Sequence, residues 1–112
     1  MRDRTERGKV GWHPVSGAET LGDDEAMALE IAGKPVALCR SHGRLHAVHN
    51  ICTHQFALLS DGYVEDGCIE CPLHQGRFSL ETGAPLGAPV SDPIAVYEVR
   101  VEDGKTYVRI PD

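Results

Sequence analysis

Two short boxes of cysteine and histidine constrain this chain more than any other feature. The first box is Cys52-Thr53-His54, and after sixteen residues the second is Cys71-Pro72-Leu73-His74. Together they supply two thiolates and two imidazoles, a ligand set that selects zinc, copper or iron–sulfur clusters over the hard ions magnesium and calcium. One or two residues between the members of a box suit a tight loop that turns both side chains toward one centre. The sequence therefore predicts a metal site formed by two loops.

The order of the ligands helps to separate the candidate metals. A zinc finger that binds nucleic acid has the order Cys, Cys, His, His, with its histidines on a helix, whereas the order here is Cys, His, Cys, His. A [2Fe-2S] centre in which two histidines replace two cysteines on one iron uses the same four ligands. In that arrangement Cys52 and Cys71 hold the inner iron, and His54 and His74 hold the outer one. The spacing alone leaves a zinc site open.

At these boxes the sequence resembles the Rieske ferredoxins that serve bacterial aromatic-ring-hydroxylating dioxygenases. The likeness extends from about Gly11 to the end of the chain. The matching segments are Asn50 to Gln55, Leu59 to Gly62, Ile69 to Phe78, and Thr82-Gly83. In addition, Pro85 to Val90 is similar to the proline-containing loop that lies over the cluster in this family.

This resemblance implies both a fold and a cofactor. The implied fold is all-β, an antiparallel β-sandwich of short strands of the Rieske iron–sulfur protein type, with a cluster-binding subdomain formed by two loops. The implied cofactor is one Rieske-type [2Fe-2S] cluster per chain. The residues that match the family's ligands are Cys52, His54, Cys71 and His74.

The resemblance also implies a one-electron carrier and not an enzyme. The cluster has no open coordination position for substrate, and the rest of the sequence offers no nucleophile, oxyanion hole or nucleotide loop. The implied donor is an NAD(P)H-dependent flavoprotein ferredoxin reductase, and the implied acceptor is the terminal oxygenase of an aromatic-ring dioxygenase. One alternative is the small subunit of an assimilatory nitrite reductase, which shares the fold but often lacks some ligands. The other is a structural zinc module that organises protein contacts.

Length and charge set the broad class of the chain. Its 112 residues suit one small domain, and we expect a poorly ordered tail over 1–10, a single domain over 11–112 and cluster-binding loops within 50–90. The formal net charge of −6 disfavours nucleic acid as a partner. The charged amino terminus has no apolar run of the signal-peptide or membrane-anchor type, so we expect a cytoplasmic monomer without membrane contact.

Short apolar or alternating runs between glycine-containing turns predict antiparallel strands. A short helical turn is expected at 23–28 or at 57–60. The predicted strands are 26–31, 35–40, 45–49, 62–64, 68–70, 77–80, 94–101 and 106–110.

The remaining cysteines and histidines have simpler interpretations. Cys39 lies in an apolar run and is expected to be a small core residue, and Cys68 is expected to be a buried or half-buried strand residue. His42 and His46 flank a turn and are expected to lie in solvent. His49 fits the alternation of a strand better than a ligand position.

The residues around the second box allow a prediction of the reduction potential. In the high-potential Rieske proteins of respiratory complexes, a serine and a tyrosine occupy the places that hold Gly76 and Phe78 here, and a disulfide joins the places that hold Ala57 and Leu73. Hydrogen bonds to the cluster sulfurs raise the potential. The resemblance therefore implies a low-potential centre.

Overall fold

The computed structural model describes residues 11–53, 57–73, 75–87, 90 and 92–111. These residues form ten strands and two short 3-10 turns, arranged as three antiparallel sheets with the orders β1-β10-β9, β2-β3-β4-β8 and β5-β6-β7. The strands are β1 (Trp12–Val15), β2 (Glu25–Ile31), β3 (Lys34–Ser41), β4 (Arg44–His49), β5 (Tyr63–Glu65), β6 (Cys68–Glu70), β7 (Arg77–Ser79), β8 (Val96–Tyr97), β9 (Val99–Glu102) and β10 (Lys105–Arg109). The turns are η1 (Ala18–Thr20) and η2 (Leu59–Asp61).

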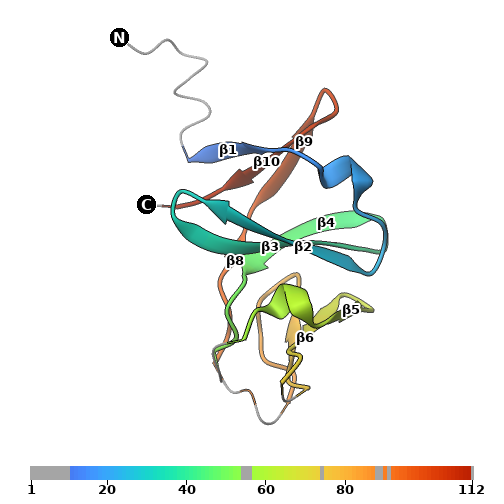
Figure 1. The fold of residues 1–112 in the computed structure, drawn as a ribbon, viewed down its shortest axis with the longest axis vertical. Coiled ribbons are helices and arrows are strands. Elements are labelled where there is room, and N and C mark those ends of the chain that lie inside the picture. The colour runs from blue at the N-terminus through green and yellow to red at the C-terminus, as the bar shows by residue number, and fades with distance from the viewer. Residues whose placement is uncertain (1–10, 54–56, 74, 88–89, 91, 112) are drawn as a thin grey trace.

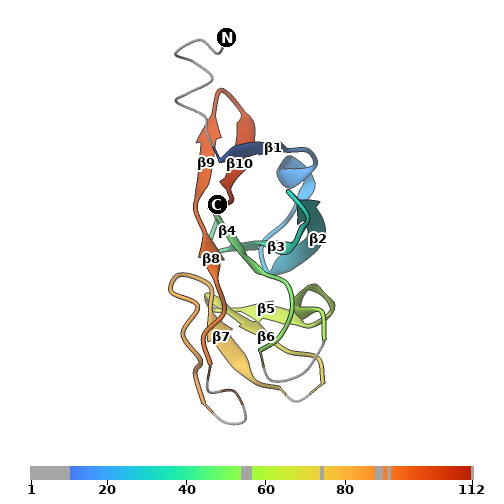
Figure 2. The ribbon, with the colours of Figure 1, turned by 90° about the vertical axis from the view of Figure 1, so that its left-hand side faces the viewer.

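The four-stranded sheet is the middle layer of the molecule, between the β1-β10-β9 sheet and the β5-β6-β7 sheet (Figures 1 and 2). Its strand β3 is buried on both faces. Val36 and Leu38 belong to the hydrophobic cluster that contains Val108 of β10, while the intervening Ala37 and Cys39 belong to the cluster on the side of β5-β6-β7. This double burial explains why the run reads as continuously apolar.

Four two-residue turns connect the strands of the hairpins. Both residues of each turn have positive φ, with glycine in the second position, as a turn of this handedness requires between twisted antiparallel strands. The turns are Ala32-Gly33, His42-Gly43, Asp66-Gly67 and Asp103-Gly104. They fix the register of their hairpins, of which β3-β4 runs into the first box and β5-β6 into the second.

The predicted all-β class is confirmed, with several local differences. Residues 23–28 do not form a helical turn, because Glu25 already pairs with Arg40 as the first residue of β2. The helical turn near 57–60 is present as η2. The predicted strand 94–101 is interrupted at Glu98, since β8 and β9 belong to different sheets. Strand β1 was not predicted; it contains Pro14, which an edge strand tolerates.

The histidines outside the boxes differ in burial. His42 is exposed, as predicted. His46 is half-buried, which contradicts the prediction of a solvated residue, and this burial lowers the pKa of its ring. His49 lies in β4 with its ring 3.4 Å from the Tyr97 hydroxyl. In the part of the chain that the structure describes, no helix is long and apolar enough to cross a bilayer.

Candidate metal centre

The two cysteines of the boxes occupy equivalent positions in two loops. Ile51 pairs with Leu58, and the next amide, Cys52 N–H, donates to the carbonyl oxygen of Ala57 at 3.0 Å. In the second loop Glu70 pairs with Arg77, and Cys71 N–H donates to the carbonyl oxygen of Gly76 at 2.8 Å. Each cysteine therefore opens a six-residue loop, 52–57 or 71–76, that its own amide closes. The sequence boxes alone gave no sign of this shared construction.

Both sulfurs come from the interior of the domain. Cys52 is 3% exposed and Cys71 is fully buried, and both belong to the hydrophobic cluster that contains Ile69 and Phe78. The structure thus brings two of the four predicted ligands to one core. The other two, His54 and His74, lie outside the described residues.

The donor set fits a cluster with cysteine on one iron and histidine on the other. The two thiolates come from matched loop positions in an apolar core, which suits soft ligands shielded from water. Among the described residues, no group of three or more His, Cys, Asp or Glu side chains forms a separate metal site. The described part of the chain therefore offers no competing centre.

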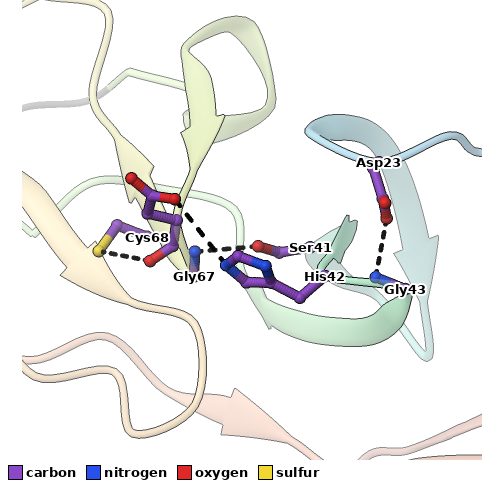
Figure 3. A network of polar contacts seen from close by, with 7 residues as sticks. Asp23, Ser41, His42, Gly43, Gly67 and Cys68 are labelled. Carbon is purple, nitrogen blue, oxygen red and sulfur yellow. Dashed lines mark hydrogen bonds and ion pairs between the residues drawn. The ribbon is translucent and has the colours of Figure 1, made fainter.

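The two other cysteines lie in environments that disfavour ligation. Cys39 is fully buried in β3, and burial raises the pKa of its thiol to about 12, so it stays protonated, whereas a metal binds the thiolate. Cys68 is half-buried in β6, and its thiol donates to the carbonyl oxygen of Asp66 at 3.7 Å (Figure 3). Because strand side chains alternate, Cys68 faces away from the side that Ile69 faces. Both observations agree with the predicted core and half-buried roles.

The segment that follows β7 lies against both ligand loops. Pro85 forms a bridge with Phe78, and Leu86 N–H donates to the carbonyl oxygen of Arg77 at 2.9 Å. Further along, the hydroxyl of Thr53, the middle residue of the first box, donates to the carbonyl oxygen of Asp92 at 2.9 Å. Of the predicted loop 85–90 over the cluster, residues 88 and 89 lie outside the described residues.

Three exposed leucines lie in the segments that form this end of the domain. Leu58 follows the first ligand loop, Leu73 belongs to the second, and Leu86 lies in the segment after β7; they are 43%, 63% and 51% exposed. Sequence reasoning did not single out these leucines as a group. The sequence signal that could have identified them is one apolar residue in each of three segments that are otherwise predicted to be loops.

A protein-family model described as the Rieske [2Fe-2S] domain matches residues 11–98 of the chain. This chain belongs to the Rieske [2Fe-2S] domain family. Its cofactor is therefore a Rieske-type [2Fe-2S] cluster, as the donor set indicated.

Relatives of this Rieske protein are similar over nearly their whole length. The anthranilate 1,2-dioxygenase ferredoxin subunit of Burkholderia cepacia is 44% identical over 106 residues, which is 95% of this chain and 98% of the relative. The ferredoxin of carbazole 1,9a-dioxygenase from Nocardioides aromaticivorans IC177 superposes on this structure with a TM-score of 0.83 at 32% identity. The superposition covers 88% of this chain and 96% of that ferredoxin. A chain in the complex of reduced oxygenase and oxidised ferredoxin in carbazole 1,9a-dioxygenase matches with a TM-score of 0.83, 34% identity, and coverage of 88% and 93%.

Proposed function

We propose that this protein is the Rieske ferredoxin of an aromatic-ring dioxygenase system. It carries one electron at a time from an NAD(P)H-dependent flavoprotein reductase to a terminal oxygenase, and it is not itself the enzyme. The observation that carries the proposal is the 44% identity, over 95% of the chain, to a ferredoxin subunit of a dioxygenase. The match to a ferredoxin solved together with its oxygenase supports the terminal oxygenase as a partner. The relatives favour this function over a nitrite reductase subunit or a zinc module.

The proposed ligands are Cys52 and Cys71 on one iron and His54 and His74 on the other. When bound, the cluster accepts and releases one electron. The chain supplies two sulfurs from a buried core, two amide N–H groups that close the ligand loops, and a segment after β7 that contacts both loops. Such a site suits a one-electron carrier, because the loops that hold the two thiolates are closed by hydrogen bonds of their own backbone.

A single domain over 11–112, with the cluster-binding loops within 50–90, remains our proposal for the organisation of the chain. It is supported by the pairing of β1 with β10, which joins the two ends of the domain in one sheet. The tail over 1–10 lies outside the described residues. A cytoplasmic location and a monomeric state stay predictions from the sequence.

The exposed leucines support an oxygenase-docking face at the cluster end. Leu58, Leu73 and Leu86 come from three segments around the two ligand loops, and exposed apolar residues gathered in one region mark protein contacts. We include in this face His54 and His74, their sequence neighbours Gln55 and Gln75, and the Pro85 to Pro89 loop. Small transient interfaces suffice for redox encounters.

The docking face is tested with two matched variants, Leu86→Glu and Val101→Glu. Val101 is 58% exposed on β9, in the sheet at the opposite end of the molecule (Figure 1). The dithionite-reduced protein is mixed in a stopped-flow instrument with the oxygenase of the Burkholderia cepacia anthranilate 1,2-dioxygenase. Leu86→Glu should slow reoxidation about tenfold, because a carboxylate must be desolvated at the interface, while Val101→Glu transfers like wild type. Equal reoxidation rates for the two variants would show that the docking face lies elsewhere. If the wild-type protein transferred no electron, this class of oxygenase would be contradicted as the partner.

The electron-carrier role is tested on the isolated protein. Iron and sulfide analysis should give one [2Fe-2S] cluster per chain, and coulometry should give one electron per cluster. A colourless protein that contains zinc would support the structural zinc module and refute the carrier.

A further inference from the structure

Asn50 has an unusual position for a polar side chain. Among the described residues, only Ser41, Asn50 and Thr106 are buried polar residues, and Asn50 is 2% exposed. It lies between the end of β4 and the first ligand loop, two residues before Cys52. Its backbone N–H donates to the carbonyl oxygen of Pro35 at 3.0 Å, and its carbonyl oxygen accepts from Leu59 N–H at 2.8 Å.

The side-chain amide of Asn50 makes two further hydrogen bonds, both to Ser60. Its Oδ1 accepts from Ser60 N–H at 2.8 Å, and its Nδ2 donates to Ser60 Oγ at 2.9 Å. Ser60 lies in η2, the turn through which the chain leaves the first ligand loop. The amide therefore ties the strand that enters this loop to the turn that leaves it.

The turn held by Asn50 also touches the second ligand loop. Gly62 follows η2, and a side chain added there would overlap the carbonyl oxygen of Glu70 and lie 3.1 Å from the ring of Pro72. Glu70 and Pro72 flank Cys71 in the chain. Asn50 thus lies at the base of the first loop and holds the turn that packs against the base of the second.

We infer that Asn50 is a positioning residue for the cluster, and that its side-chain amide fixes η2 against the stems of both ligand loops. This inference rests on the proposed ligand set. Without the amide, the Ser60 N–H has no side-chain acceptor at this position, and a half-buried donor left without its acceptor shifts the equilibrium toward an opened loop by about tenfold. An opened loop exposes Cys52 and shortens the lifetime of the bound cluster.

Ser41 provides a control for the general cost of losing a buried hydrogen bond. It is 1% exposed, and its Oγ accepts from Gly67 N–H at 2.9 Å across the junction between the middle sheet and the β5-β6 turn (Figure 3). Gly67 precedes β6, whereas Cys71 follows it. Ser41→Ala therefore removes a comparable bond from the same subdomain at the far end of β6 from the ligand.

An aspartate provides the conservative replacement for Asn50. Its oxygens can accept from both Ser60 N–H and the Ser60 hydroxyl, which is able to donate as well as accept. Asn50→Asp should therefore preserve the tie to η2, while Asn50→Ala removes it.

The experiment uses the cluster-loaded protein and its three variants Asn50→Ala, Asn50→Asp and Ser41→Ala. We measure the rate of bleaching of the visible absorbance at fixed temperature, the electron paramagnetic resonance spectrum of the reduced cluster, and thermal unfolding by far-UV circular dichroism. Asn50→Ala should bleach about tenfold faster and show altered g values. Asn50→Asp should approach wild type, and Ser41→Ala should unfold at lower temperature with an unchanged spectrum and bleaching rate.

The inference would be overturned if Asn50→Ala bleached at the wild-type rate with wild-type g values. It would also be overturned if Ser41→Ala changed the bleaching rate and the g values as much as Asn50→Ala does. If Asn50→Ala does not fold, Ser60→Ala takes its place, since it removes one of the two amide contacts and keeps the Ser60 N–H. It should then bleach faster than Ser41→Ala, and equal rates would overturn the inference. A wild-type protein that holds no cluster would instead contradict the proposed function.

Discussion

Gly62→Ala should damage the second ligand loop from a position outside both boxes. Gly62 has a φ of −92°, so a residue with a side chain carries no left-handed strain here, and the obstacle to it is the lack of space around its Cβ. A Cβ would overlap the carbonyl oxygen of Glu70 and lie 3.1 Å from Cδ of Pro72. Because the main obstacle is backbone, relief of the overlap must move the chain on either side of Cys71.

The expected cost follows from this geometry. Overpacking that forces a backbone shift destabilises a domain by about 3 kcal/mol, which lowers the melting temperature by roughly 10 to 20 °C in a domain of this size. Gly33→Ala is the matched control, since Gly33 has a φ of 78° and a Cβ added there would meet no atom within 4 Å. That variant carries only left-handed strain, about 1 kcal/mol.

The assay is thermal unfolding followed in parallel by far-UV circular dichroism and by the visible absorbance of the cluster. Gly62→Ala should unfold well below Gly33→Ala and should lose or alter the absorbance of the cluster, whereas Gly33→Ala should keep the wild-type spectrum. If the two variants unfold within a few degrees of each other and both keep that spectrum, the close approach of η2 to the second loop does not hold Cys71 in place.

Three further predictions test the ligands, the potential and the pH dependence. Cys71→Ser should abolish the visible absorbance while Cys68→Ala retains it, and equal bleaching of both would contradict the ligand set. Voltammetry should give a midpoint in the lower part of the roughly −150 to +300 mV window, because neither Gly76 nor Phe78 offers a hydroxyl to the sulfurs; a value well above zero would contradict the low-potential class. Burial, and then Lys34, lower the pKa of His49 below 6.5, so the unfolded chain binds more protons and the free energy of unfolding should fall as pH drops through 6.5. His49→Gln should reduce this slope in urea titrations, and an unchanged slope would exclude the contribution of His49.

The sequence by itself determined the local features. The soft ligand set followed from residue types and spacing, and the hairpin turns followed from glycines that permit positive φ, as at Gly67. The choice between an iron–sulfur cluster and zinc needed the resemblance carried by the flanking residues, since spacing left both open. The all-β class was confirmed because short apolar or alternating runs between glycine-containing turns are determined by local conformation.

The interruption of the predicted strand 94–101 depends on the tertiary structure. The chain on either side of Glu98 reads as one alternating run, yet β8 pairs with β4 while β9 pairs with β10. Pairing partners far apart in the sequence decide where a strand changes sheets, and periodicity within the run carries no information about them.

The roles of Asn50 and Gly62 were likewise decided by tertiary contacts. Both residues belong to segments that the sequence marked as similar to the family, but nothing local distinguishes a buried asparagine from a turn residue, or a glycine needed for space from one needed for its φ. Their roles arise from the amide of Asn50 meeting Ser60 and from the backbone of Glu70 approaching Gly62. Close approaches of this kind depend on how η2 packs between the two ligand loops, and the packing of one segment against another exists only once the chain has folded.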